Sequence, residues 1–453
     1  MAIMTNVKKT IYYFQRNGLK KTCLAAFERL QARSEEPYRF VPVSEEVLKR
    51  QRDEILSKQT EKLPLFSILV PAYRTKEIYL RQLIDSLLIQ SYTVWELVLA
   101  DATEDESVKQ IALSYGEDRI RYVKLAQNGG ISDNSNEGLL HVSGDYVGLL
   151  DHDDILTPDA LYEMYQAVRL GMENGCRLQM IYSDEDKCDG DAVTFFEPHM
   201  KEDFNLDLLL SNNYICHFLM LKRELIQELG FRKEFDGAQD YDLVLRSVRA
   251  ILQQENGTRL IGHVPKVLYH WRCHQASTAE NPKSKTYAYE AGKKALECCL
   301  KENNISATVE NLPHVGFYRA DYRGRYFELR RDLGAVGGRV LKKGKLIGGR
   351  MDAEGHVYYE NLKDGYSGPM HRAVLTQDAL AVDLRCMLLS KECEELFFQV
   401  TGVAYRVDET TGVADIKALP EDTDFKELSL KLCEAVRDKG YMIMWDPEIY
   451  VKY

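Results

Sequence analysis

An acidic cluster, Asp151, Asp153 and Asp154, stands directly after an apolar, strand-like run and could carry chemistry. Crowded carboxylates repel one another unless a cation or hydrogen-bond donors offset their charge. Mg²⁺ or Mn²⁺ held by one or two of them, together with substrate phosphates, would supply that cation. The alternative is an acidic turn in which Asp154 caps the helix after Pro158, but the position at a strand end favours the metal site.

A second pair of carboxylates, Asp240 and Asp242, is spaced two apart at the start of a helical pattern. An ionised Asp placed beside a reacting hydroxyl can act as a general base. The same spacing suits helix capping, because acids are favoured at the positive end of a helix dipole. These two residues alone leave both interpretations open.

A third candidate group, His270 and Arg272, ends a strand-like run shortly before Ser277 and Thr278. The histidine could bind a metal and the arginine a phosphate, although a lone histidine is more often structural. The signatures G-x-x-x-x-G-K-[ST], G-x-S-x-G and H-E-x-x-H do not occur. P-loop hydrolysis, serine-hydrolase chemistry and zincin chemistry are therefore disfavoured.

The elements that must position these residues alternate along the chain. Strands are predicted at 65–70, 95–100, 120–125 and 146–150, and helices at 79–90, 108–115 and 131–140. This alternation predicts an α/β fold with a mostly parallel sheet flanked by helices. Ligands bind beyond the carboxyl ends of such strands, which is where Pro71, Asp101 and Asp151 fall.

Six motifs occur in order along this part of the chain: Ser67-Ile-Leu-Val-Pro-Ala-Tyr73, Leu97-Val-Leu-Ala-Asp101, Asn128-Gly-Gly-Ile-Ser-Asp-Asn-Ser-Asn136, Gly144-Asp-Tyr-Val-Gly-Leu-Leu-Asp-His-Asp-Asp154, Gly237-Ala-Gln-Asp240 and Tyr269-His-Trp-Arg272. Together they resemble a family 2 glycosyltransferase with a GT-A, Rossmann-like fold, of the bacterial surface-polysaccharide type. The resemblance extends from about Pro64 to Thr278. The ordered set is far more specific than any single motif.

The resemblance implies a role for each matching residue. It puts Pro71, Ala72 and Tyr73 beside the nucleotide base, Asp101 on the base or ribose, and Asp133 where it helps to orient the donor. Asp151 and Asp153 would hold the sugar and the diphosphate-bound Mg²⁺ or Mn²⁺, and His270 would complete the metal site. Arg272 would contact the diphosphate.

The implied activity is an inverting, metal-dependent transfer of a hexosyl or deoxyhexosyl group from a nucleotide sugar to a hydroxyl of a glycan or lipid-linked acceptor. Asp240 would deprotonate that hydroxyl, although Gln239 stands where relatives usually have Glu. A non-catalytic nucleotide-sugar-binding or scaffold subunit of a polysaccharide assembly complex is the alternative. A sugar nucleotidyltransferase ranks last, because Pro71-Ala-Tyr-Arg replaces the Gly-rich phosphate loop it would need.

We divide the chain into an N-terminal helix and charged linker (1–62), a catalytic domain (63–310) and an accessory domain (311–453). In residues 1–33, seven basic residues face one acidic residue, Glu28, and apolar residues recur at roughly helical spacing. Such a helix could lie on an anionic membrane surface, or pack on its own domain with a solvated basic face. The highly charged residues 34–62 indicate a linker or a solvent-facing helix.

The accessory domain contains a weak sequence repeat of part of the catalytic domain. A helix-like stretch that begins at Tyr241 resembles one that begins at Leu428. The strand-like stretch at 261–270 likewise resembles the stretch at 441–450. Both patterns predict an amphipathic helix and then a strand with Pro in its middle. The acidic cluster and the nucleotide-binding strands have no counterpart after Leu312, so we expect a degenerate, non-catalytic half-repeat. An unrelated accessory domain is the alternative.

The composition limits the partners. The chain of 453 residues has a net charge of −11, which makes it a poor general binder of nucleic acid. Its 10 cysteines are scattered without a C-x-x-C, which fits a reducing compartment. No apolar run reaches the ~18–20 residues that span a bilayer, and no signal-peptide core is present. We therefore expect a cytoplasmic protein whose basic N-terminal helix could contact the inner face of the cell membrane.

Overall fold

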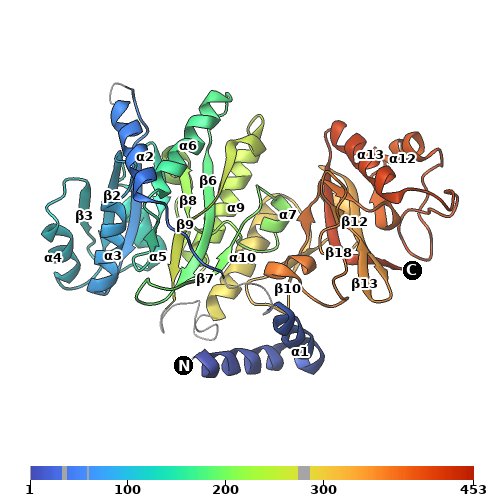
Figure 1. Ribbon diagram of the computed structural model, residues 1–453, viewed down its shortest axis with the longest axis horizontal. Helices are drawn as coiled ribbons and strands as arrows, with labels where there is room; N and C mark the ends of the chain where they lie inside the picture. Colours follow the sequence, from blue (N-terminus) through green and yellow to red (C-terminus); the bar gives the residue numbers. More distant parts are fainter. Residues whose placement is uncertain (1, 33–37, 59–60, 274–285) are drawn as a thin grey trace. The chain divides into compact units, whose positions relative to one another are not determined.

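The computed structural model describes residues 2–32, 38–58, 61–273 and 286–453. The chain forms two compact units (Figure 1). The first unit comprises Pro37–Phe204 and Tyr214–Ala295, and the second comprises Met1–Glu36, Asn205–Asn213 and Leu296–Tyr453. Residues 274–278, where the family resemblance ends, lie outside the described residues.

The first unit is built on one large sheet with the strand order β3-β2-β1-β4-β8-β6-β9-β5, and β7 pairs with β6. The strands are β1 (Phe66–Ala72), β2 (Trp95–Asp101), β3 (Ile120–Lys124), β4 (Tyr146–Leu149), β5 (Ile155–Leu156), β6 (Met180–Cys188), β7 (Phe195–His199), β8 (Leu219–Lys222) and β9 (Ile261–Arg272). Strands β1 to β4 are parallel, and β6 is parallel to β9. The predicted mostly parallel sheet is confirmed, with β8 inserted antiparallel between β4 and β6.

Helices cover both faces of this sheet. Apolar side chains of α3 (Glu77–Leu88), α4 (Ser107–Ser114) and α6 (Ala160–Glu173) share one core with β1 and β2. Helix α5 (Ile131–Leu139) packs on the opposite face, where a Cβ on Gly138 would lie 2.5 Å from Leu69 Cδ1. Helices α8 (Arg223–Leu229) and α9 (Gln239–Leu252) follow β8, and α10 (Thr286–Glu302) follows β9. The three predicted helices therefore form close to their expected positions.

The predicted linker contains helix α2 (Glu45–Ser57), which packs on the first unit along one side. Ile55 is 2% exposed and belongs to the hydrophobic core. Gln51 accepts a hydrogen bond from Ser91, and Glu54 accepts one from Tyr162 Oη at 2.5 Å. Helix α2 thus has a buried face in addition to its charged, solvent-facing one.

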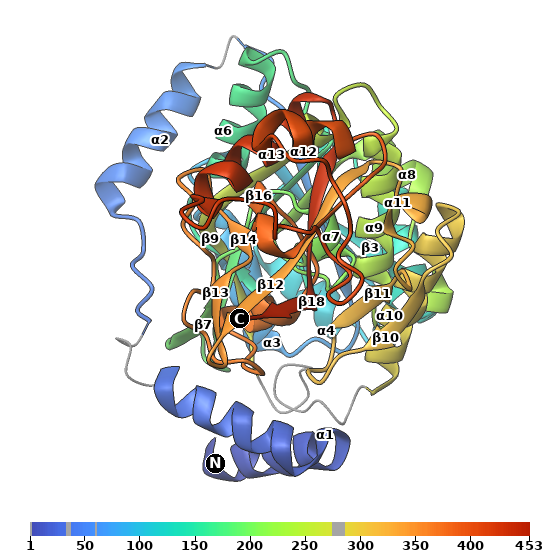
Figure 2. The same ribbon diagram turned by 90° about the vertical axis from the view of Figure 1, so that its right-hand side faces the viewer.

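The second unit has a smaller sheet in which β12 (Leu333–Lys342) lies parallel to β18 (Met442–Lys452). The neighbouring strands are β13 (Lys345–Gly348), β15 (Gln377–Asp378) and β17 (Met387–Leu389). Two further pairs are β10 (Thr308–Asn311) with β11 (Tyr318–Asp321), and β14 (Arg350–Met351) with β16 (Ala381–Val382). Helices α7 (Leu206–Leu209) and α11 (Tyr326–Leu329) are short, and α12 (Glu394–Thr401) packs beside α13 (Phe425–Asp438) (Figure 2).

Helix α1 (Ala2–Ala32) belongs to the second unit and is interrupted at Gly18, whose φ of 75° is left-handed. Arg16 donates to the carbonyl of Leu312 at 3.1 Å, and Glu28 accepts from the amide of Gly368 at 2.6 Å. Large apolar side chains nevertheless remain exposed on this helix: Ile11, Phe14, Leu19, Phe27 and Leu30. In the described part of the chain, no helix has the length and apolarity needed to cross a bilayer.

Candidate active site

The acidic turn begins where β4 ends, and Asp154 anchors it. The Asp154 side chain is buried and accepts hydrogen bonds from the Tyr269 hydroxyl and, at 2.7 Å, from the Arg272 amide. Burial and the neighbouring carboxylates raise the pKa of Asp154 well above its usual range. Asp154 does not cap α6, whose N-cap residue is Asp159. The turn is therefore held by Asp154, while the Asp151 side chain keeps 48% of its surface exposed.

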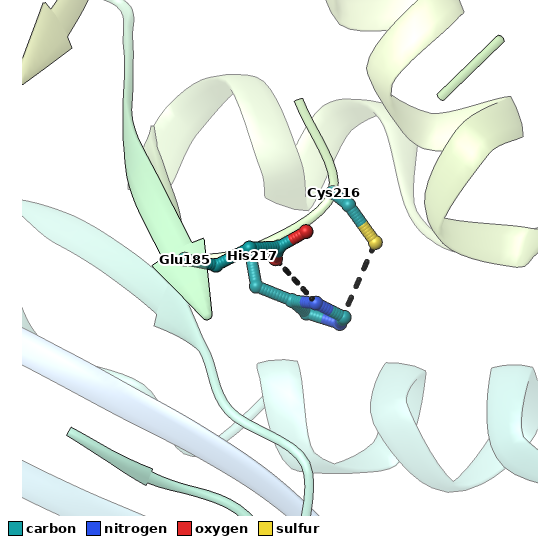
Figure 3. A group of neighbouring side chains, drawn as sticks. All are labelled: Glu185, Cys216 and His217. Carbon is teal, nitrogen blue, oxygen red and sulfur yellow. Dashed lines mark hydrogen bonds and ion pairs between the residues drawn. The ribbon is translucent and has the colours of Figure 1, made fainter. Parts of the chain in front are cut away.

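Four side chains from three parts of the chain, Glu185, Cys216, His217 and Asp240, meet beside Asp151. Figure 3 shows the first three of them. His217 places Nε2 3.9 Å from Asp151 Oδ2 and Nδ1 3.1 Å from Glu185 Oε2. The Cys216 thiol lies 3.7 Å from His217 Nε2 and donates to Asp240 Oδ2, also at 3.7 Å. The predicted metal-binding turn and the predicted base are thus linked through the Cys216–His217 pair.

The charges in this cluster favour an ionised carboxylate beside a protonated imidazole. Burial alone would raise the pKa of Glu185, but Lys201 and hydrogen bonds from His199 and His217 hold it well below its usual range. Burial would lower the pKa of His217, but interactions with Cys216 and Glu185 hold it well above its usual range. His217 therefore offers a positive charge close to Asp151.

The predicted nucleotide-binding residues come together at the carboxyl ends of β1 and β2, where Ala72 is the register partner of Asp101. Pro71 and Tyr73 are partly exposed there. Asp101 is 0% exposed, and its oxygens accept hydrogen bonds from the Thr103 amide and the Tyr122 hydroxyl, both at 2.8 Å. In this structure Asp101 therefore fixes the end of β2, and its contact with a base or ribose stays a prediction.

Asp133 lies in the first turn of α5, with its side chain 43% exposed. Its Oδ2 accepts a hydrogen bond from Lys233 Nζ at 2.5 Å. The ion pair ties α5 to the segment between α8 and α9. The role of Asp133 in orienting a donor stays a prediction.

Asp240 lies in the first turn of α9, and the two acids of this helix have separate roles. Asp242 is buried and pairs with Arg232 and with Arg246, whose Nε donates to it at 2.9 Å. Gln239 accepts a hydrogen bond from the Gly237 amide at 2.9 Å. Asp242 is thus a buried ion-pair partner, and Gln239 stabilises the turn that leads into the helix.

The structure places His270 and Arg272 on β9, and their predicted roles toward the metal and the diphosphate stay predictions. Side chains alternate along β9, and His217 stacks on Tyr269, so His270 faces the other side of the sheet. His270 Nδ1 lies 2.5 Å from Asp186 Oδ1. Arg272 is 0% exposed and donates to the carbonyl of Asp153. His270 therefore lies away from the cluster at Asp151, and Arg272 supports the acidic turn from within.

Sequence reasoning missed Glu185, Cys216 and His217. One available signal was Ser183-Asp-Glu-Asp186 within a strand-like run, because consecutive buried acids need partners. Another was the adjacent Cys and His directly before an apolar strand. Neither signal shows which of the acids Asp184, Glu185 and Asp186 faces the site.

Comparison with known proteins addresses the same part of the chain. Residues 67–230 match the family described as "Glycosyl transferase family 2". This domain belongs to glycosyl transferase family 2. The predicted recognition is thereby confirmed for the domain that carries Asp151, Glu185 and His217.

Two relatives and one solved structure place this glycosyltransferase domain in context. The chain is 39% identical over 264 residues to "Uncharacterized protein y4gI" of Sinorhizobium fredii, covering 57% of this chain and 28% of the relative. It is 34% identical over 270 residues to "O-antigen biosynthesis protein RfbC" of Myxococcus xanthus, covering 58% and 20%. S. aureus TarS 1-349 in complex with UDP is 17% identical with a TM-score of 0.40, covering 59% of this chain and 72% of that chain. The match thus spans only 28% and 20% of the length of these two relatives.

Proposed function

We propose that this chain is an inverting glycosyltransferase of cell-surface polysaccharide synthesis. It moves a hexosyl or deoxyhexosyl group from a nucleotide sugar to a hydroxyl of a glycan or lipid-linked acceptor. The observation that supports this most directly is the link from Asp151 through His217 and Cys216 to Asp240. Asp151, the predicted donor-binding acid, and Asp240, the candidate base, then lie on opposite sides of the Cys216–His217 pair.

The residues of the acidic turn fit a divalent cation. Asp151 and Asp153 offer hard carboxylate oxygens, which Mg²⁺ and Mn²⁺ prefer, on a turn fixed by Asp154 and Arg272. A bound Mg²⁺ or Mn²⁺ would neutralise the negative charge that develops on the departing nucleoside diphosphate. The positive charge of His217 adds to this stabilisation from the protein side.

The chemical step needs one base. Asp240 takes the proton of the acceptor hydroxyl while its oxygen attacks the anomeric carbon. The new carbon–oxygen bond forms on the face opposite the breaking bond to the diphosphate, so the configuration inverts. Cys216 donates to Asp240 Oδ2, and this hydrogen bond holds the carboxylate in place for the incoming hydroxyl.

The second part of the proposal concerns location. The protein works in the cytoplasm, and helix α1 contacts the anionic inner face of the cell membrane. The exposed apolar side chains of α1 lie on the same helix as the basic residues Lys20 and Lys21. Binding to anionic vesicles that weakens at high salt is the expected result, and absence of binding at any salt concentration contradicts it.

One observation favours a second candidate, a non-catalytic nucleotide-sugar-binding subunit. Gln239 stands in place of the family's Glu and is used to hold the Gly237 amide. The two candidates are separated by a mass-spectrometric screen of nucleotide sugars and glycan acceptors with Mn²⁺. Sugar transfer that a chelator stops supports the enzyme, whereas tight nucleotide binding without transfer across the panel supports the binding subunit.

A further inference from the structure

A cluster of three different ligand types lies beside Asp240. Glu185, Cys216 and His217 each present one ligand atom, and these atoms lie within 4.8 Å of one another (Figure 3). Thiolate and imidazole ligands suit Zn²⁺ and related transition metals, whereas Mg²⁺ prefers oxygen ligands alone. We propose that these three residues bind Zn²⁺, at a site whose ligands differ from those of the acidic turn.

The ligand atoms are already close to the required spacing. Glu185 Oε2 and His217 Nδ1 are 3.1 Å apart, and two tetrahedral ligands each about 2.0–2.2 Å from zinc lie at a similar separation. Cys216 Sγ is 3.7 Å from the other ring nitrogen of His217. A single ion binds one of the two ring nitrogens, and one ligand atom from each of the three residues already lies within 4.8 Å of the others.

Neighbouring groups hold these ligands in place. Lys201 Nζ donates to the carbonyl of Ile215 at 2.6 Å and to that of His217, so the backbone on both sides of Cys216 is fixed. His199 Nδ1 lies 3.2 Å from Glu185 Oε1, the oxygen that His217 leaves unused. Outer contacts of this kind orient metal ligands and strengthen binding.

Binding requires a proton balance. The Cys216 thiol loses its proton and binds as thiolate, and the imidazolium of His217 loses the proton that it shares with Glu185. Both protons go to solvent. The carboxylate of Glu185 binds in its ionised form and releases no proton. Lys201 lies 3.7 Å away and balances its remaining charge.

Zinc at this site also affects the proposed base. Cys216 Sγ is the donor to Asp240 Oδ2, and a metal-bound thiolate has no proton to donate. The ion adds a positive charge beside Asp240, which makes this carboxylate a poorer proton acceptor. Zn²⁺ should therefore inhibit sugar transfer. This consequence rests on the proposed function, whereas zinc binding itself does not.

The test uses the full chain after removal of metals with a chelator. Co²⁺, a spectroscopic substitute for Zn²⁺, is titrated into the wild type and the Cys216→Ser and Cys176→Ser variants. Cys176 is a half-buried cysteine of the same unit and serves as the matched control. The wild type and Cys176→Ser should show a near-ultraviolet thiolate-to-cobalt band that Zn²⁺ displaces. Cys216→Ser should lose the band.

Absence of the band in the wild type, or its persistence in Cys216→Ser, overturns the proposal. Glu185→Gln tests the carboxylate independently: the band should remain while Co²⁺ affinity falls at least about 10-fold, and unchanged affinity removes Glu185 from the site. Thermal denaturation verifies that each variant is folded. If no donor supports transfer, the proposed function fails, but the cobalt titration still decides the metal site.

Discussion

The two units contain a helix–strand arrangement with the same connectivity but different side chains. In the first unit α9 leads into β9, which lies parallel to β6, and in the second α13 leads into β18, which lies parallel to β12. Both return strands contain a proline, Pro265 and Pro447, and both pairings include shifts of register. The helix and Pro-containing strand predicted from the sequence repeat are thus present in both units.

The difference lies in the strand that pairs in parallel with each return strand, β6 in the first unit and β12 in the second. Strand β6 carries three consecutive acids, each paired with a histidine: Asp184 with His263 at 3.0 Å, Glu185 with His217 at 3.1 Å, and Asp186 with His270 at 2.5 Å. Strand β12 has Gly337 and Gly338 in its middle, and a Cβ on Gly337 would lie 2.3 Å from Val382 Cβ. The same scaffold therefore supports a polar cluster in one unit and close backbone packing in the other.

The largest expected difference between the units concerns the first turns of α9 and α13. Asp240→Asn should reduce sugar transfer by roughly 10²–10⁴-fold, because an amide cannot accept the hydroxyl proton. Nucleotide binding, measured by calorimetry, should survive. Glu427→Gln is the matched control, since the repeat places Glu427 opposite Asp240, and it should leave transfer unchanged. An Asp240→Asn variant that remains active would disprove the assigned base.

The second difference concerns metal use. Asp153→Asn should raise the Mn²⁺ concentration needed for half-maximal transfer by about 10–100-fold, because one carboxylate ligand is lost. The second unit also contains a group with possible metal ligands, Asp352, Glu354 and His356. Asp352→Asn should not change the Mn²⁺ requirement of transfer. Equal effects of the two substitutions on the Mn²⁺ requirement would mean that the acidic turn does not bind the metal used in transfer.

The sequence predicts the scaffold well because local patterns determine it. Short apolar runs and helical periodicity locate β1, β2 and α3, and the acidic cluster marks the end of β4. These features depend on residues close together in the sequence. The fold and the position of the acidic turn therefore follow from the sequence alone.

The remaining part of the site depends on which face of a strand each residue occupies. Glu185 reaches the cluster while its neighbours Asp184 and Asp186 face away, and His270 faces away while Tyr269 does not. A one-residue difference changes the face completely. Such a choice requires the sheet register, which the motifs of a single sequence do not supply.

A smaller effect tests the close packing of the second unit. Gly337→Ala should lower the free energy of unfolding by about 1–3 kcal/mol, because the added methyl group overlaps Val382. Gly344→Ala is the comparison variant: its φ is 71°, but its Cβ would meet no atom within 4 Å, so its cost of about 1 kcal/mol arises from backbone strain alone. Chemical denaturation measures both. A Gly337→Ala variant as stable as the wild type would show that β12 has room for side chains after all.

The smallest effect concerns pH, and its sign should differ between the units. In the second unit His314 and His371 stack with ring centroids 3.5 Å apart, and burial lowers their pKa values to about 3 and about 4. Between these values and the ordinary pKa of about 6.5, the unfolded chain binds more protons than the folded chain. The stability contributed by the pair is complete above about pH 6.5 and is lost as the pH falls.

His217 in the first unit has a raised pKa, so its contribution is complete below about pH 6.5 and is lost as the pH rises through the raised value. His314→Phe should therefore reduce the loss of stability between pH 7.5 and pH 5 by about 1 kcal/mol in chemical denaturation. His141→Phe changes an exposed histidine of the first unit and should leave that loss unchanged. If His314→Phe retains the full acid sensitivity of the wild type, the stacked pair is not its source, and the contrast between buried neutral and buried charged histidines does not hold.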